Sequence, residues 1–207
     1  NQKISDKVML FEIPATIRFK TGDSITDHPI TVREKSEDFY IPLEFAPEIV
    51  RFDPNFTILA KVTFSKPTPL LMAQLEDESD VIGRILAIHG LSKNKSQKTI
   101  DALKLSLNED SFHGVRMQAA DALKSIHTHE ALGALLSSAQ QSDARVRLRV
   151  QSAIGGFYNP DALESAIKSI EEESNPLIIN TAIRSLGGYG SDGIASILLE
   201  FLSKPSY

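Results

Sequence analysis

The chain has 207 residues, of which 42% are hydrophobic and 24% are charged, as in an ordinary globular protein that buries about 70% of the surface of its unfolded form. A formal net charge of −5, with no Lys/Arg cluster among aromatic residues, argues against nucleic acid as a partner. No apolar run approaches the ~20 residues of a membrane span. The sequence contains no cysteine, which excludes disulfides, a thiol nucleophile and thiolate metal ligands.

Residues 8–64 alternate between apolar and polar side chains, which predicts β-strands. The alternation is clearest at residues 9–19, 39–45 and 56–64. Favoured turn residues separate these runs at 21–23, 27–29, 46–48 and 53–55,. Seven of the ten Phe residues fall in this third of the chain. The pattern predicts a small antiparallel β-sandwich whose aromatic side chains face inward.

The chain begins at Asn1 without a Met, and about sixty residues are few for a sandwich, since such folds need several paired strands. We therefore expect a fragment whose sandwich has a further strand upstream, and whose unpaired β half associates with other copies at high concentration. Prolines at 67 and 69 end the last strand and begin the first helix,. The sequence thus predicts a β-sandwich domain at 1–66 and a helical domain at 67–207, held in a fixed relation by a short, stiff junction.

From about residue 69 onward the sequence repeats in steps of roughly 31 or 32 residues, which is the signature of stacked helical hairpins. First helices are predicted at 69–77, 100–108, 131–139, 162–170 and 194–202, and second helices at 83–91, 115–123, 146–154 and 178–186. A hairpin of this length must stack on a neighbour to bury its apolar face. Small residues mark the expected close helix contacts, namely Ala87, Ala119, Ala122, Ala153 and Ala182.

The second helices carry an acidic residue, a short gap, a Val-Arg pair and then an alanine stripe, best seen at Asp143, Val146 and Arg147. This pattern resembles HEAT-type repeats. The predicted fold class is therefore multidomain β plus α, with a small antiparallel β-sandwich followed by an α-α superhelix of HEAT-like helical hairpins.

Candidate metal ligands are few. His127 and His129 are the only close pair of histidines, and Glu130 lies beside them. The spacing of the sequence suggests no further ligand that would complete a site with them, so we favour a solvent-facing loop over a metal site. The other histidines are scattered singly, at His28, His89 and His113. We predict no metal site in this chain.

Three further motifs have both a functional and a structural interpretation. The glycines at 155–156 and 187–190 could form phosphate loops, but each follows a predicted helix, so we interpret them as helix C-caps,. Arg145, Arg147 and Arg149 could bind an anion, but we favour an ion pair of Asp143 with Arg147 plus solvated arginines,. The glycosylation pattern at 55–57 carries no weight. No Ser/His/Asp group and no His-Glu-x-x-His is present,, so we predict no catalytic or cofactor-binding residue.

Several segments together resemble the C-terminal half of the M1-family zinc aminopeptidases, the gluzincins. The resemblance rests on residues 11–17, 39–43 and 46–54, on Gln74-Leu75, and on Gly83-Arg84 with Ala87. It implies that zinc, its ligands and the general base belong to an upstream catalytic domain outside this sequence. It also implies that the sandwich is a spacer and that the helical domain packs against the catalytic domain and restricts its cavity to peptide N-termini.

Two functions therefore compete. The first is a non-catalytic C-terminal fragment of a zinc aminopeptidase, with the catalytic domain and its peptide substrates as partners. The alternative is a HEAT scaffold that binds another protein through its concave face, without peptidase activity. Whether the parent is an enzyme stays open, because one relative of similar architecture, a subunit associated with the TATA-binding protein, lacks the zinc motif. Cysteine usage does not fix the compartment; we favour a soluble bacterial cytoplasmic protein over an exported one.

Overall fold

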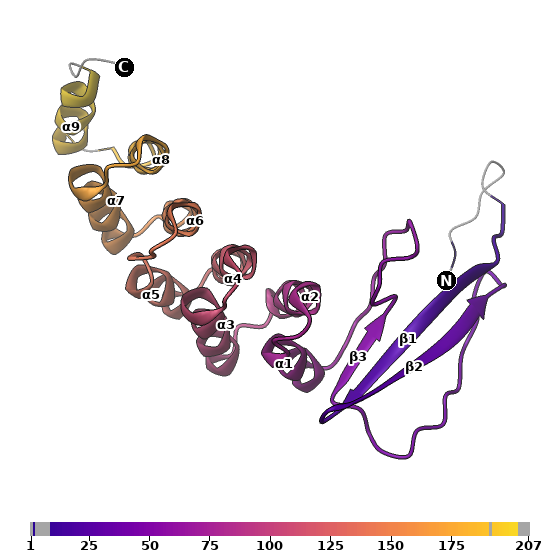
Figure 1. Cartoon of the computed structure of the whole chain (residues 1–207). Helices are drawn as coiled ribbons and strands as arrows, with labels where there is room; N and C mark the ends of the chain where they lie inside the picture. The colour runs from indigo at the N-terminus through magenta and orange to yellow at the C-terminus, as the bar shows by residue number, and fades with distance from the viewer. Residues whose placement is uncertain (1, 3–8, 191, 203–207) are drawn as a thin grey trace. The chain divides into compact units, whose positions relative to one another are not determined.

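The computed structural model describes residues 2, 9–190 and 192–202. Its strands precede its helices (Figure 1), which confirms the predicted class of a β part followed by helical repeats. The chain divides into two compact units, Asn1–Gly90 and Leu91–Tyr207. The first unit holds the sheet and the first helical hairpin, and the second holds the remaining helices. The domain boundary between residues 66 and 67 stays a prediction.

The β part is a three-stranded antiparallel sheet of β1 (Ile13–Thr21), β2 (Ser24–Val32) and β3 (Ile49–Phe52), in the order β2-β1-β3. β1 and β2 pair from Ile13 with Val32 to Thr21 with Ser24. The two-residue turn between them begins at Gly22, whose φ is 54°. Glycine tolerates this left-handed conformation without strain. The turn predicted at 21–23 is confirmed.

Other β predictions were wrong. Residues 27–29 are not a turn but lie within β2, where Pro29 pairs with Thr16; a proline is tolerated because β2 is an edge strand of this sheet,. Residues 39–45 and 56–64 form no strands. After Phe56, whose φ is positive, the backbone N–H groups of Thr57 and Ile58 donate to the Asp53 carboxylate. They are therefore not available for a sheet ladder.

The prediction that the aromatic side chains of the β part face inward was also wrong. Five of the seven phenylalanines in the β part are exposed in the structure: Phe11, Phe39, Phe45, Phe56 and Phe64. In the described residues there is one sheet rather than two packed layers, so these side chains have no opposing sheet to cover them. The expected association of copies through this half of the chain stays a prediction.

A row of charged side chains crosses the sheet and continues onto the first helical hairpin. Arg18 of β1 lies opposite Arg51 of β3. Arg18 pairs with Asp27 of β2 at 2.7 Å, and Arg51 pairs with Asp80 at 2.7 Å. Because each arginine has its own carboxylate, the two like charges can stand side by side. The Arg51 pair, together with the 2.9 Å pair of Lys20 and Asp77, fastens the sheet to the hairpin.

Every predicted helix forms, with ends that differ by a few residues. The helices are α1 (Thr68–Glu76), α2 (Val81–Leu91), α3 (Gln97–Glu109), α4 (His113–Ile126), α5 (His129–Ser137), α6 (Ala144–Ile154), α7 (Pro160–Glu172), α8 (Pro176–Leu186) and α9 (Asp192–Leu202). Several begin at a side chain that caps the first turn, as at Ser96, Thr128, Asp143, Asn159 and Asn175,.

In the second unit, the first helices of the hairpins (α3, α5, α7 and α9) lie in one layer and the second helices (α4, α6 and α8) in the other, as Figure 1 shows. Ala119, Ala153 and Ala182 are buried between the layers. Large apolar side chains fill the remaining core, among them Leu103, Leu107, Leu123, Leu135, Ile154 and Leu186. The small residues permit the close helix contacts that the sequence predicted.

Candidate functional site

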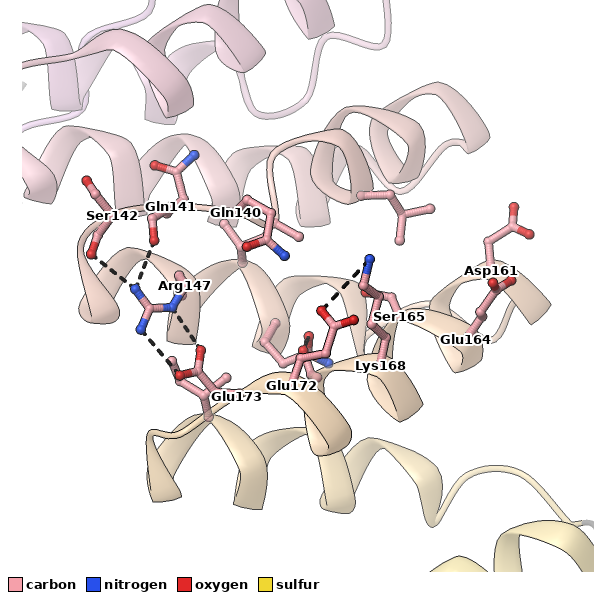
Figure 2. A pocket seen from close by; sticks show the side chains of 16 residues that line it. Gln140, Gln141, Ser142, Arg147, Asp161, Glu164, Ser165, Lys168, Glu172 and Glu173 are labelled. Carbon is pink, nitrogen blue, oxygen red and sulfur yellow. Dashed lines mark hydrogen bonds and ion pairs between the residues drawn. The ribbon is translucent and has the colours of Figure 1, made fainter.

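A groove of about 760 Å³ lies in the second unit between α6, α7 and the segment that follows α5. It opens because α5 is short. α3 and α7 each have 13 residues, whereas α5 has 9, a difference of about 6 Å at 1.5 Å per residue. Residues 138–143 cross where the rest of that helix would lie, and they leave one face of α7 uncovered (Figure 2).

A polar cluster holds this crossing segment in place. The Ser138 hydroxyl donates to the carbonyl of Ala134, as serine does when it ends a helix,. Asn108 of α3 donates to Ser138 at 2.9 Å, and Gln141 donates to the Asn108 carbonyl oxygen at 2.9 Å. Ser138 and Gln141 are both buried. One wall of the groove is therefore fixed by hydrogen bonds to the preceding repeat.

Arg147 closes one end of the groove. Its guanidinium donates to both carboxylate oxygens of Glu173, at 2.8 and 3.3 Å, and to the carbonyls of Gln141 and Ser142, at 2.9 and 3.1 Å (Figure 2). These hydrogen bonds lower the pKa of Glu173, and the carboxylate raises the pKa of Arg147. Arg147 thus ties the crossing segment to the end of α7, and most of its donors are used within the protein.

Gln151 of α6 lines the groove and is only 3% exposed. Its carbonyl oxygen accepts a hydrogen bond from the Ser169 hydroxyl at 2.9 Å. Its Nε2 is buried and has no hydrogen-bond partner among the residues that the structure describes. A buried donor without a partner costs about 1–3 kcal/mol, and in the described chain Gln151 shares this state with Arg51 Nη2 and with Arg116 Nε of α4.

The exposed edge of α7 is acidic. Asp161 and Glu164 point away from the Arg147 end (Figure 2), and within the described chain neither carboxylate has an ion-pair partner. Lys168 lies 3.9 Å from Glu172. The groove therefore has four carboxylates (Asp161, Glu164, Glu172 and Glu173) and two cations, Arg147 and Lys168. Arg147 already faces Glu173, and Lys168 already faces Glu172.

Arg145, Arg147 and Arg149 each pair with a different carboxylate, and the pairing differs from the predicted one. Arg145, not Arg147, pairs with Asp143 at 2.6 Å. Arg147 instead reaches Glu173 in the next repeat, and Arg149 lies 3.6 Å from Asp121 in the preceding one. The predicted ion pair of Asp143 with Arg147 was wrong because the cap position turns the Asp143 carboxylate toward the N–H and guanidinium of Arg145.

The histidine group and the glycine motifs lie at the ends of helices. His127 ends α4 in the left-handed conformation and stacks on Phe157 at 4.4 Å, while His129 and Glu130 begin α5. Gly155 and Gly187 follow α6 and α8 as C-caps, which confirms the structural interpretation. Over the described residues, no group of three or more His, Asp or Glu side chains is placed to hold a metal ion.

Sequence reasoning missed the groove and its residues Gln151, Asp161, Glu164 and Glu173. The repeat alignment gave 131–139 the same length as the other first helices. The available signal was Ser137-Ser138, because serine is a poor helix former and favours helix ends.

A second feature is found on the first unit, at two segments that form no strand, residues 39–45 and 56–64. Large apolar side chains are exposed there, and the most exposed are Tyr40 at 93% and Leu59 at 106%. Others on these segments are Phe39, Leu43, Phe45, Phe56, Val62 and Phe64. Exposed apolar side chains in such number are typical of surfaces that contact another protein.

Comparison with known proteins identifies one segment. Residues 68–154 match the family model for HEAT repeats, which covers α1 to α6. No curated protein matches the chain. The helical region therefore contains HEAT-like repeats, and neither comparison indicates a zinc aminopeptidase. Among the helices of the described ranges, none combines the length and apolar character needed to cross a bilayer.

Proposed function

We propose that this chain is a helical-repeat scaffold that holds a segment of a protein partner in the groove beside α7. The observation that carries the proposal is the groove itself, in which a buried amide and two carboxylates have no partner within the described protein. Stacked helical repeats commonly use their extended surfaces to bind other proteins. The HEAT-repeat match at 68–154 supports this class of function.

The groove is suited to binding because its walls are fixed before a ligand arrives. Arg147 and Glu173 brace one end, and the hydrogen bonds of Asn108, Ser138 and Gln141 hold the crossing segment. A preformed site loses less conformational entropy on binding than a flexible one. The apolar side chains of Leu136, Val150 and Ile178 also line it, so a bound segment gains from burial as well as from polar contacts.

Selection from a library of random short peptides on the immobilised full chain tests this function. Ser165→Tyr fills the groove from α7, and Ser152→Tyr places the same side chain on an exposed part of α6 outside the groove. We expect the parent and Ser152→Tyr to enrich the same peptides, and Ser165→Tyr to lose them while keeping the parent's helical circular dichroism. Equal enrichment on Ser165→Tyr, or no enrichment on the parent, would contradict the proposal.

We also propose a second function, in which the chain packs against an upstream catalytic domain of a zinc aminopeptidase and restricts access to its active site. The exposed apolar side chains of 39–45 and 56–64 favour it, because a covering domain would remove them from water at about 25 cal/mol per Å². Zinc would then belong to that domain and not to this chain.

The gene upstream of Asn1 tests the second proposal. An encoded His-Glu-x-x-His with a downstream Glu and a Gly-x-Met-Glu-Asn segment is expected, and a gene without them would eliminate the aminopeptidase. In a chain that includes this domain, Tyr40→Glu and Leu59→Glu should expose the interface to proteolysis, whereas Thr26→Glu on the edge strand β2 should not. Equal protection in all three variants would also contradict this interface.

A further inference from the structure

We propose that the groove selects an extended peptide segment that carries a Lys or Arg side chain. In this arrangement the Gln151 amide donates to a backbone carbonyl of the segment, and Asp161 and Glu164 accept from its cation. The inference rests on the proposed function, because it names the chemistry of the partner that the groove would hold.

The Gln151 amide indicates a ligand that offers a hydrogen-bond acceptor. Gln151 lines the groove, and its Nε2 is buried behind this lining without a partner in the described protein. The Ser169 hydroxyl donates to the Gln151 Oε1, which leaves Nε2 as the end of the amide without a partner. An extended peptide offers backbone carbonyls that its own structure does not use. Binding such a carbonyl would remove the cost of the unpaired donor.

The charges of the groove indicate a cationic side chain. Asp161 and Glu164 are three residues apart on α7, so their side chains lie on one face of the helix,. Lys168 is nearest to Glu172 rather than to Glu164. An anionic ligand has little to bind, because Arg147 already donates to Glu173 and to two carbonyls. The carboxylate excess therefore favours a basic partner over an acidic one.

The spacing of these groups fits an extended chain. Ser169, which holds Gln151, and Glu164 are five residues apart on α7, or about 7.5 Å along the axis. An extended chain covers that distance in about two residues. From Asp161 to Glu172 the groove extends about 17 Å along α7, which about five extended residues would span. A short segment can therefore reach both the amide and the carboxylates.

The peptide selection described above provides the first test. We expect the peptides that depend on the open groove to be enriched in Lys or Arg, and a charge-reversed chain, Asp161→Lys with Glu164→Lys, to lose that preference. Enrichment that depends on the groove but shows no basic preference would overturn this inference and leave the proposed function intact. No enrichment that depends on the groove would overturn both.

Fluorescence polarisation with one enriched peptide, and with the same peptide carrying Gln in place of its basic residue, gives the second test. Asp161→Asn with Glu164→Gln should weaken the basic peptide about three- to tenfold, and added salt should reduce the difference. Glu171→Gln removes a charge from the same helix outside the groove and should leave binding unchanged. If the doubly neutralised variant binds as Glu171→Gln does, the assigned carboxylates are wrong.

The role of Gln151 has its own readout. Gln151→Leu should weaken the basic peptide and its Gln version by a similar factor, because the amide reads the peptide backbone. Its melting temperature should stay close to that of the parent, because leucine removes the unpaired Nε2 while the half-buried Ser169 hydroxyl loses its acceptor,. A lower melting temperature with unchanged affinity would show that Gln151 serves the core of the repeat and not the ligand.

Discussion

The ion pair between Arg51 and Asp80 makes the sharpest prediction about stability. Arg51 is 3% exposed, and in the described part of the chain the Asp80 carboxylate is the only acceptor that its side chain reaches. The other Asp80 oxygen accepts from the Gly83 N–H at 2.7 Å, at the start of α2. Asp80→Asn keeps an oxygen for Gly83 but turns an NH₂ group toward the guanidinium, so Arg51 loses its counter-charge and its hydrogen bond together.

We expect this change to destabilise the sheet by about 3 kcal/mol. Removing one partner of a buried ion pair typically costs about 3–5 kcal/mol, and we take the lower end because the Asp80 side chain is 28% exposed. The pair of Arg18 and Asp27 has the same chemistry and the same 2.7 Å distance, but its side chains are 31% and 41% exposed. Asp27→Asn should therefore cost less than about 1 kcal/mol.

Amide hydrogen exchange of the full chain measures this difference locally, because the slowest amides of β1 and β3 report the opening free energy of the sheet. Arg51→Met combined with Asp80→Asn should recover most of the loss, since no unpaired charge is left in the sheet. Equal losses for Asp80→Asn and Asp27→Asn would refute the reasoning, because burial would then not decide the strength of these pairs. A double variant as unstable as Asp80→Asn would refute it as well.

Three further predictions concern stability. Ala119→Leu should destabilise the repeats by about 1–3 kcal/mol in urea unfolding, because Ala119 is fully buried in α4 and overpacking forces helices apart; Ala195→Leu on the exposed face of α9 should be nearly neutral. Burial lowers the pKa of Lys66 from 10.5 to about 8, so stability should rise with pH between these values, where the unfolded chain binds more protons, and Lys66→Met should lack the rise. Arg147 lowers the pKa of Glu173, so the stability that Arg147→Met removes should be present at about pH 6 and lost as the pH falls below about 4.

The helical half could be predicted from the sequence because its information is local and repeated. The apolar spacing of each segment selects one face, and the same spacing recurs at each step along the chain, so errors in one repeat are corrected by the others. Ala119 and Ala153 were placed in helix contacts for this reason, and both are buried. Cap residues such as Ser96 and Asn159 then set the helix ends,.

The β half could not be predicted to the same degree because alternation shows which residues could face a core but not which strands pair. Residues 39–45 alternate as regularly as Ile13–Thr21, yet only the latter find partners. β2 was missed because Asp27, His28 and Pro29 are typical turn residues, and their tolerance at an edge strand depends on the pairing itself,. Asp53 was correctly placed in a turn, but its capture of the following N–H groups depends on side-chain geometry.

The groove depends on a departure from the repeat, and this explains why repeat-based reasoning did not find it. In a regular stack each first helix covers its neighbour along its full length, so polar groups at that contact would be buried without partners and would be costly. Where α5 ends early, Ser169 and Gln151 meet each other, and Asp161, Glu164 and Lys168 stay on an uncovered face of α7. Arg147 of α6 bridges one end of this gap to Glu173. The shortened helix therefore accounts for the hollow, and polar groups can line it because no neighbouring helix covers them there.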